Sequence, residues 1–492
     1  MDTRQPSIDR RTLLGASAAA LLMAARGARA EETTAPPPAA GDKKLSELIA
    51  DFTIGFDLKS APPLAVERAR LAFTDTMGVM LAGSREKVAE IACDMVKAEG
   101  SAPAASVVGQ SFRASPQLAA LANGVAAHAM DYDFSYIMGQ PMVPIIPALL
   151  PLAEVTGATP SDVVAAFVVG FEVASRMARA NTTQSLAGGW HAVGTIGTTG
   201  AAVACARLLK LPAPAVVDAV GISASLANGF SANFGTMTKP LHAGHAARDG
   251  MMAALLAQRG FTANPAALEG TNGYYHAFAR GLEVTFAPFH DLGRSYDIVE
   301  RGFKPKRYPC GGLGHTAIDA TLELREALLP RLADITGITA SITRYAAQRI
   351  GSKYPASIEN AKFSMPYLAA YTLVHGAPML AAFSERAIQD GRVREAARLV
   401  SVAIDPEFGE IFAESPSRII VTFKDGSRIE KLRYYASGTP QFPLTGEQIE
   451  EKFMDCAVQA VDRQTAGKIF AAMQTLGQTS SFDALWPLVR RA

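Results

Sequence analysis

Cysteine is scarce in this sequence, with four residues among 492. They stand at positions 93, 205, 310 and 456, so no two of them form a C-x-x-C pair. This spacing argues against a zinc ribbon and against a disulfide scaffold. The fold is therefore expected to depend on a hydrophobic interior.

A surplus of charge of either sign is also lacking. The formal net charge is +1, so the chain shows no basic excess of the kind that nucleic-acid binding usually leaves. Hydrophobic residues at 49% and charged residues at 19% are typical of a soluble globular protein rather than a disordered or membrane-embedded one. The length predicts two or three domains, each with a sizeable core.

The apolar run at residues 13–25 is too short to span a bilayer comfortably, which takes about 20 residues. It follows Arg10 and Arg11 and precedes the small-residue site Ala28-Arg29-Ala30. This pattern predicts a twin-arginine signal peptide at residues 1–30, cleaved after Ala30, with export to the periplasm by the twin-arginine machinery. An uncleaved membrane anchor is the alternative. Residues 31–42, which contain three prolines, are expected to form a linker.

The remaining chain divides by its hydrophobic periodicity. Residues 43–302 repeat apolar side chains mostly at three and four residues, which predicts a succession of helices. Residues 335–345 and 417–435 are β-rich, and Asp425-Gly426 is placed as a hairpin turn. Amphipathic helix returns from residue 445 to the end. We therefore expect a mainly α large domain, formed by residues 43–302 and 445–492, with an inserted α+β domain at residues 303–444.

Charged and titratable side chains collect at residues 231–250 (SANFGTMTKPLHAGHAARDG). Pro240 suits the first turn of a helix, so Lys239 is expected beside free backbone N–H groups at the positive end of a helix dipole. Such a place favours a bound carboxylate or phosphate. An exposed lysine at a helix start is the plainer interpretation.

Six segments resemble the MmgE/PrpD family, in order along nearly the whole chain after the signal. They are residues 69–84 (ARLAFTDTMGVMLAGS), 121–133 (LANGVAAHAMDYD), 189–197 (GWHAVGTIG), 237–247 (MTKPLHAGHAA), 306–320 (KRYPCGGLGHTAIDA) and 361–376 (AKFSMPYLAAYTLVHG). The resemblance implies the mainly helical domain and inserted lid, an active site between them, and a homodimer. It implies no metal and no organic cofactor.

The same resemblance implies site residues. The predicted catalytic residues are Asp131, His191, Lys239 and Lys306, and the predicted substrate-binding residues are Ser135, Gln140, His242 and His315. Two lysines and a histidine can pair with the charges of a di- or tricarboxylate, and a nearby aspartate can orient them or accept a proton.

The predicted function is a cofactor-independent lyase acting on a di- or tricarboxylic acid. It is either a dehydratase of the 2-methylcitrate type or a decarboxylase of the cis-aconitate type. The alternatives are an epimerase or isomerase of a dicarboxylate and a non-catalytic periplasmic carboxylate-binding protein.

One departure from the family pattern affects the mechanism. Phe134 replaces an acid of the D-D-T pattern, and Gln140 stands before Pro141 where the family has a histidine that is its leading acid or base. Glutamine cannot shuttle a proton near neutral pH. The candidate substitutes are Tyr136, His191, His242, His245 and Lys306.

Other motifs give weaker hypotheses. His242, His245 and Asp249 share a helical face at metal-ligand spacing, but Gly244 loosens that turn. A nucleophilic Cys310 paired with His315 lacks an orienting acid. The glycine-rich segments at residues 194–200 and 312–317 fit turns and close packing better than dinucleotide loops.

Overall fold

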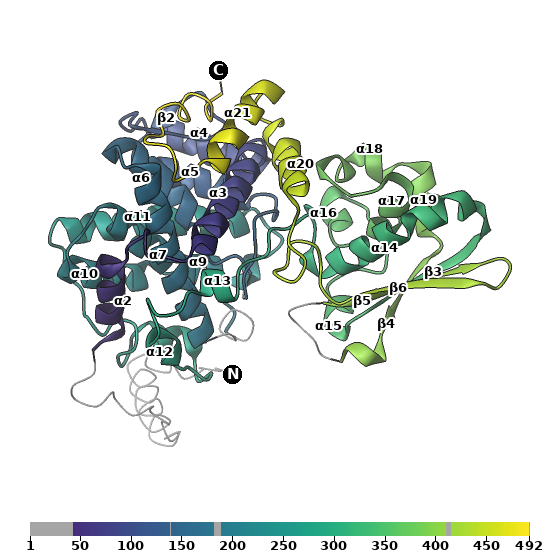
Figure 1. Cartoon of the computed structure of the whole chain (residues 1–492), viewed down its shortest axis with the longest axis horizontal. Helices are drawn as coiled ribbons and strands as arrows, with labels where there is room; N and C mark the ends of the chain where they lie inside the picture. Colours follow the sequence, from purple (N-terminus) through teal and green to yellow (C-terminus); the bar gives the residue numbers. More distant parts are fainter. Residues whose placement is uncertain (1–42, 138, 182–187, 410–414, 492) are drawn as a thin grey trace, which may run out of the picture. The chain divides into compact units, whose positions relative to one another are not determined.

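The computed structural model describes residues 43–137, 139–181, 188–409 and 415–491. The predicted signal peptide and linker lie outside the described residues, so both remain predictions. The described chain is mainly helical and contains two small sheets (Figure 1). No helix among the described residues combines the length and the apolar character needed to cross a membrane.

The first part of the chain is helical, as its periodicity predicts. Its helices are α2 (Leu45–Gly55), α3 (Pro63–Gly83), α4 (Lys87–Ala98), α5 (Pro116–His128), α6 (Ile145–Thr156), α7 (Pro160–Ala180), α9 (Ala192–Leu208), α10 (Ala213–Leu226), α11 (Thr238–Gln258), α12 (Tyr274–Ala279) and α13 (Asp297–Glu300). A two-stranded sheet of β1 (Ala105–Ser106) and β2 (Arg113–Ala114) was not predicted, because two-residue strands carry no readable alternation.

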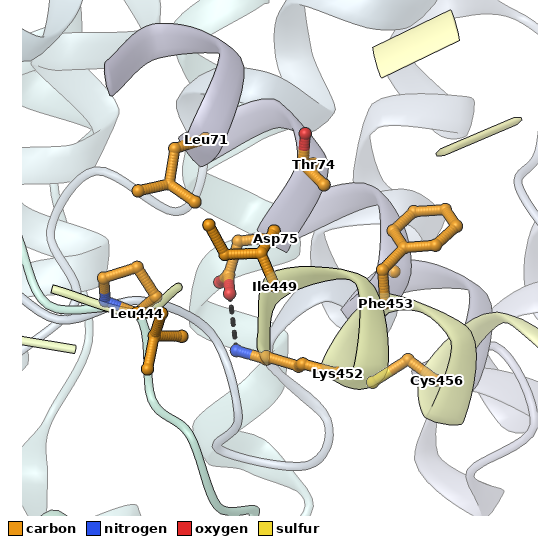
Figure 2. Close-up of a pocket in the computed structure, with 10 residues that line it drawn as sticks. Leu71, Thr74, Asp75, Leu444, Ile449, Lys452, Phe453 and Cys456 are labelled. Carbon is orange, nitrogen blue, oxygen red and sulfur yellow. Dashed lines mark hydrogen bonds and ion pairs between the residues drawn. The ribbon is translucent and has the colours of Figure 1, made fainter. Parts of the chain in front are cut away.

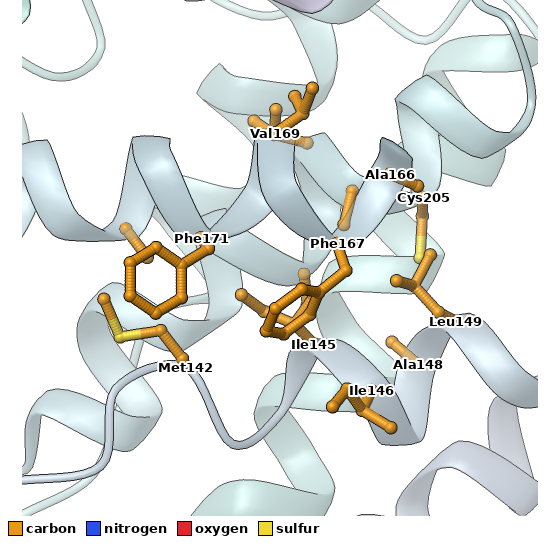
Figure 3. Packing of buried hydrophobic residues seen from close by; sticks show 14 of the residues in the cluster. Met142, Ile145, Ile146, Ala148, Leu149, Ala166, Phe167, Val169, Phe171 and Cys205 are labelled. Carbon is orange, nitrogen blue, oxygen red and sulfur yellow. The ribbon is translucent and has the colours of Figure 1, made fainter. Parts of the chain in front are cut away.

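The core of this part is built where α6, α7 and α9 meet. Phe167 and Phe171 of α7 are fully buried and lie near Ile145 and Met142, with Cys205 of α9 in the same cluster (Figure 3). Burying a large apolar side chain contributes about 1.5–3 kcal/mol, so this cluster supplies much of the stability of the helical part.

Small residues bring α5 and α11 close together. A Cβ atom on Gly244 of α11 would lie 2.5 Å from the carbonyl oxygen of Leu121, and one on Gly124 of α5 would lie 2.7 Å from that of Ala243. Real Cβ atoms do not approach backbone so closely, so the helices touch through their glycines. This contact matters for function because His128 ends α5 and Lys239 lies in the first turn of α11.

The β-rich segments form one four-stranded sheet. Its strands are β3 (Ile335–Ile342), β4 (Val400–Ile404), β5 (Ser417–Phe423) and β6 (Arg428–Arg433), in the order β4-β3-β5-β6. The β3–β4 pair is parallel and the other two pairs are antiparallel. The predicted β5–β6 hairpin is confirmed, with Gly426 at φ 79° and the Asp425 carboxylate accepting from the Ser427 amide at 2.9 Å.

Helices cover one face of this sheet. They include α14 (His315–Leu328) and α17 (Met365–His375), whose Ala317, Ala320 and Met365 pack in one cluster with Ile338 and Val421 of the strands (Figure 1). The shorter helices of this segment are α15 (Arg344–Ala347), α16 (Ile358–Ala361), α18 (Glu385–Ile388) and α19 (Gly391–Ala397). This segment therefore contains both helices and a sheet. The predicted lid domain and its bounds at residues 303–444 stay predictions.

The last helices, α20 (Gly446–Ala457) and α21 (Arg463–Gln474), pack against α3 near the start of the chain. The prediction of helix to the end was wrong for residues 475–491, which form turns after Gly477 at φ 85°. Glycine in the left-handed region commonly ends a helical segment.

Candidate active site

Asp131 is the centre of a compact ion cluster. Its carboxylate lies 2.7 Å from the ammonium of Lys239 and 3.0 Å from that of Lys306, and it accepts a 2.9 Å hydrogen bond from the Gln140 side chain. Lys306 also donates to the Asp131 carbonyl at 2.6 Å, across a sequence separation of 175 positions. Four residues that the sequence predicted for the site are thus in direct contact.

The backbone at Asp131 is unusual. Its φ is 54°, in the left-handed region that non-glycine residues adopt seldom and aspartate more readily than most. The residue follows the end of α5, and the left-handed turn aims its carboxylate at the start of α11. Such conformations cost about 1–3 kcal/mol and cluster at functional sites.

The two ammonium groups control the ionisation of Asp131. Burial alone would raise the pKa of this carboxyl, but the charges of Lys239 and Lys306 outweigh burial and hold the pKa well below its usual range. Asp131 is therefore a carboxylate at every physiological pH. About a quarter of its side chain, 28%, is exposed, and 19% of the Lys239 side chain, so the pair can be reached by a ligand.

Lys239 does not use the helix start as predicted. Helix α11 begins at Thr238, with Pro240 in its first turn as expected, but the Lys239 amide already donates to the Thr236 carbonyl at 3.1 Å. At least one of the backbone N–H groups that were expected to bind an anion is therefore already hydrogen-bonded within the protein. The ammonium, by contrast, reaches across to Asp131.

His191 and His242 form a second pair beside the ion cluster. Their Nδ1 atoms are 2.9 Å apart, so one must carry the proton that the other accepts. Burial, followed by the electrostatic interactions with His128 and Lys239, lowers the pKa of His191 to about 2. Burial, His128 and His245 lower the pKa of His242 to about 4. Both rings are therefore neutral near pH 7.

His128 and Asp133 also belong to this group, although the sequence motifs did not select them. The Nδ1 atom of His128 is 3.1 Å from both carboxylate oxygens of Asp133, and neither side chain is exposed. The His128 ring also stacks on His191 at 5.5 Å between centroids. The available signal was the sequence HAMDYD, in which a histidine and a second aspartate flank Asp131 at short spacing.

A buried ion pair supports the loop that carries these residues. Lys452 of α20 pairs with Asp75 of α3 beside a small pocket that also includes Leu71, Phe453 and Cys456 (Figure 2). Lys452 donates to the Tyr132 carbonyl at 2.9 Å, and Asp75 accepts from the Phe134 amide at 3.1 Å. Helices from both ends of the chain thus fix the backbone between Asp131 and Ser135.

The other predicted binding residues lie at different depths. The Ser135 amide donates to the Lys304 carbonyl at 2.8 Å, which ties this loop to the segment that carries Lys306. His315 is fully buried at the start of α14, against the ring of Tyr308 at 5.1 Å. A binding role for Ser135 or His315 stays a prediction.

Two candidate proton carriers are placed away from the ion cluster. The Tyr136 hydroxyl hydrogen-bonds Ser175 at 2.6 Å, and burial raises its pKa above the usual value. His245 lies on α11, where burial and the neighbouring Arg248 lower its pKa. Neither residue contacts Asp131 within the part of the chain that the structure describes, so neither gains support as a proton carrier.

A metal could be held by different residues from those that the sequence suggested. Among the described residues, the group of metal-ligating side chains within reach of one another is His128, Asp131 and Asp133, whereas His242, His245 and Asp249 form no such group. The ammonium groups of Lys239 and Lys306 already occupy the Asp131 carboxylate, and their charge opposes a divalent cation. The donor set therefore fits an ion cluster better than a metal.

Comparison with protein families gives two adjoining matches. The MmgE/PrpD N-terminal domain matches residues 47–287, and the MmgE/PrpD C-terminal domain matches residues 308–478. The ion cluster takes Asp131, Gln140 and Lys239 from the first match, and Lys306 from the short segment between the two.

Three curated relatives are similar over most of their length. Cis-aconitate decarboxylase of Homo sapiens is 28% identical over 463 residues, covering 91% of this chain and 95% of that protein. The Mus musculus cis-aconitate decarboxylase is 26% identical, with coverage of 91% and 94%. The cis-aconitate decarboxylase of Aspergillus terreus strain NIH 2624 is 26% identical, with coverage of 87% and 92%.

Proposed function

The chain belongs to the MmgE/PrpD family, and from this premise we propose that it is a cofactor-independent lyase acting on a di- or tricarboxylic acid. The single observation that carries the proposal is the ion cluster, in which Lys239 and Lys306 converge on Asp131. Two ammonium groups and a carboxylate in a partly buried site can hold an anionic substrate and move charge and protons within it.

The lysines act as the anion partners. A substrate carboxylate binds to both ammonium groups. Asp131 holds the two ammonium groups in place through its own negative charge. When a bond next to the substrate carboxylate breaks, negative charge spreads onto its oxygens. The ammonium groups then stabilise the transition state more strongly than they stabilise the bound substrate. This difference is the requirement for catalysis.

Decarboxylation is the reaction class that the named relatives favour, since each is called a cis-aconitate decarboxylase. Dehydration of the 2-methylcitrate type and epimerisation of a dicarboxylate share the same first requirement, a proton moved beside a carboxylate. A carboxylate-binding protein without catalysis is the second candidate. Gln140 favours it, because this amide contacts Asp131 where the family has a histidine.

The cellular setting is part of the same proposal. A chain cleaved after Ala30 and exported by the twin-arginine route would meet its acid in the periplasm. A homodimer, as the family resemblance implies, is the proposed assembly. Both rest on sequence alone.

Two lysine variants test the proposal. Lys239→Ala and Lys306→Ala should each weaken binding of the acid, because losing one partner of a desolvated ion pair costs about 2–5 kcal/mol. Binding is measured by calorimetry with cis-aconitate, 2-methylcitrate and simple dicarboxylates. Lys468→Ala, an exposed lysine on α21, is the matched control and should bind as wild type does. A change below about twofold in both variants would remove these lysines from the site.

Turnover is tested separately from binding. The wild-type protein is incubated with each acid in D₂O, and C–H exchange, loss of CO₂ and loss of water are followed by NMR and mass spectrometry. Exchange or conversion supports the lyase, whereas tight binding without either supports the binding protein.

A further inference from the structure

His128 ends α5 and forms a buried pair with Asp133. A carboxylate can only accept hydrogen bonds, so the Nδ1 atom that faces it at 3.1 Å carries the proton. When the ring carries this single proton, its lone pair is on Nε2. This carboxylate-held tautomer is the arrangement that makes a histidine a base at its other nitrogen.

The Nε2 atom of His128 has no hydrogen-bond partner among the described residues, and it is buried. An unsatisfied buried polar atom costs about 1–3 kcal/mol, so such atoms are few and call for an explanation. The opposite side of the ring is fully satisfied by Asp133. The described part of the molecule therefore retains a buried basic nitrogen that binds nothing in the protein itself.

The His128 ring lies beside the ion cluster. One of its ring nitrogens and one oxygen each of Asp131 and Asp133 lie within 4.8 Å of one another. The titratable and charged groups around the ring are Asp131 and Asp133 on its own loop, His191 before α9, His242 and Lys239 on α11, and Lys306 beyond Asp131.

The neighbouring groups are poor proton carriers for specific reasons. His191 and His242 share one proton between their Nδ1 atoms and are neutral near pH 7. Gln140 does not titrate. Asp131 stays ionised between two lysines. Within the described cluster, His128 combines a buried ring nitrogen that has no hydrogen-bond partner with a carboxylate beside the ring that can balance its charge.

We propose that His128, oriented by Asp133, carries the proton of the reaction in place of the histidine that Gln140 replaces. This inference rests on the proposed lyase function. Asp133 is a positioning residue: it fixes the tautomer of His128 and lies beside the imidazolium that forms.

The proton balance is simple for either direction of transfer. In proton abstraction, Nε2 takes the proton from the carbon beside the substrate carboxylate, and the electron pair of that C–H bond moves onto the carboxylate oxygens held by Lys239 and Lys306. In decarboxylation, the C–C bond to the departing carboxylate breaks and CO₂ leaves. For this direction His128 first takes up a proton from water at Nε2. The electron pair stays on carbon and accepts that proton, which returns the His128 ring to its neutral form.

The experiment compares His128→Gln and Asp133→Asn with wild type. Each variant is assayed for C–H exchange and product formation in D₂O, for affinity toward the same acid, and for thermal unfolding. We expect turnover to fall by about 10²–10⁴-fold in His128→Gln while affinity changes less than about threefold. Asp133→Asn should lower turnover and shift the midpoint of the pH–rate profile, which loss of packing alone would not do.

The chain offers a matched control pair. His375 and Asp390 form another histidine–aspartate contact, 2.8 Å between Nε2 and a carboxylate oxygen, on α17 and just before α19. Both side chains are partly exposed, and neither belongs to the ion cluster around Asp131. His375→Gln and Asp390→Asn should leave turnover at the wild-type level.

Each outcome decides the matter. A folded His128→Gln variant that keeps turnover within about threefold of wild type overturns the role of His128 and leaves the lyase proposal intact. If His128→Gln fails to fold, Asp133→Asn decides, and an unchanged rate and pH profile in it overturns the inference. A wild-type protein that binds the acids but exchanges no proton with any of them overturns both proposals.

Discussion

Gln140 holds the Asp131 carboxylate but cannot transfer a proton near neutral pH. Its amide donates to Asp131 at 2.9 Å and helps to hold the carboxylate between two lysines. A histidine can also donate a hydrogen bond to a carboxylate, and in addition it can titrate near neutral pH. Holding the Asp131 carboxylate and transferring a proton are therefore separate roles. Gln140 can perform the first role but not the second.

Replacing Gln140 by histidine should place a side chain that can transfer a proton at this position. We expect Gln140→His to raise decarboxylase or dehydratase turnover, by about 10-fold or more if proton transfer limits the rate. The rate of product formation with cis-aconitate and 2-methylcitrate measures the effect, and Gln140→Asn controls for loss of side-chain length. No gain with any acid would mean that the proton already has an efficient carrier.

The pH dependence of His191 follows from its surroundings. Because burial and neighbouring positive groups lower its pKa to about 2, its imidazolium is present only at acidic pH and the ring is neutral from about pH 4 upward. A midpoint near neutral pH in the rate profile must therefore belong to another group. We expect His191→Asn to lower turnover but to leave such a midpoint unmoved within about 0.3 units.

The measurement is the rate at saturating acid between about pH 5 and 9, for wild type and His191→Asn side by side. Disappearance of the midpoint in the variant would show that His191 titrates in this range. The role that the family motif suggests for His191, a proton carrier with an inflection near about 6.5, would then be restored.

At the scale of elements, the contact of α5 with α11 sets the distance between His128 and Lys239, which stand at the facing ends of these helices. Their glycines allow the approach. Adding a methyl group at Gly244 would place a Cβ 2.5 Å from the Leu121 carbonyl oxygen, which is backbone and cannot turn aside.

We therefore expect Gly244→Ala to destabilise the protein by about 1–3 kcal/mol and to lower turnover, since overpacking forces the helices apart. Urea unfolding gives the free energy. Gly467→Ala on α21 is the matched control, because nothing lies within 4 Å of its added Cβ. It should stabilise by about 0.5–1 kcal/mol, the usual gain of alanine over glycine in a helix. Equal effects of the two substitutions would contradict the packing argument.

The contact of α3 with α20 has a different basis. Lys452 and Asp75 form a buried ion pair whose remaining hydrogen bonds go to the backbone of Tyr132 and Phe134 (Figure 2). Removing one partner leaves the other charge buried, which costs about 3–5 kcal/mol. Lys452→Met should therefore destabilise by about this amount in urea unfolding.

The double variant Asp75→Asn with Lys452→Met distinguishes charge from shape. It should be more stable than Lys452→Met alone, because no unpaired charge remains. Lys468→Met on the exposed side of α21 controls for the substitution itself and should change stability by less than about 0.5 kcal/mol. If the double variant is no more stable than Lys452→Met, then Asp75 does not carry an unpaired charge in Lys452→Met.

On the scale of the whole molecule, the site is assembled from distant parts of the chain. Asp131 follows α5, Lys239 begins α11 and Lys306 precedes α14, while the supporting Lys452 comes from α20 near the other end of the chain. The complete set of these contacts forms only when the chain has folded over almost its full length.

Export is predicted from Arg10 and Arg11, which lie outside the described residues. Replacing both arginines by lysine should leave the precursor in the cytoplasm, because the twin-arginine machinery reads this pair. Cell fractionation and immunoblotting of precursor and mature forms measure the effect. Normal periplasmic accumulation of the double-lysine variant would argue for the general secretory route.

The sequence by itself determined the local features of this protein. Helical periodicity marked residues 43–302, Asp425-Gly426 marked the β5–β6 hairpin, and the family motifs selected Asp131, Lys239 and Lys306. These signals are readable because each depends on residues a few positions apart or on a motif of fixed spacing.

Only the tertiary structure decided which groups meet and in what state. The pairing of His128 with Asp133, the left-handed backbone of Asp131 and the buried contact of Asp75 with Lys452, 377 positions away, depend on how distant segments pack. Burial also decides that His191 is neutral, since desolvation by surrounding elements leaves no trace in local spacing. Local sequence patterns therefore determine the helices and strands. The packing of distant segments determines which side chains meet and whether they are charged.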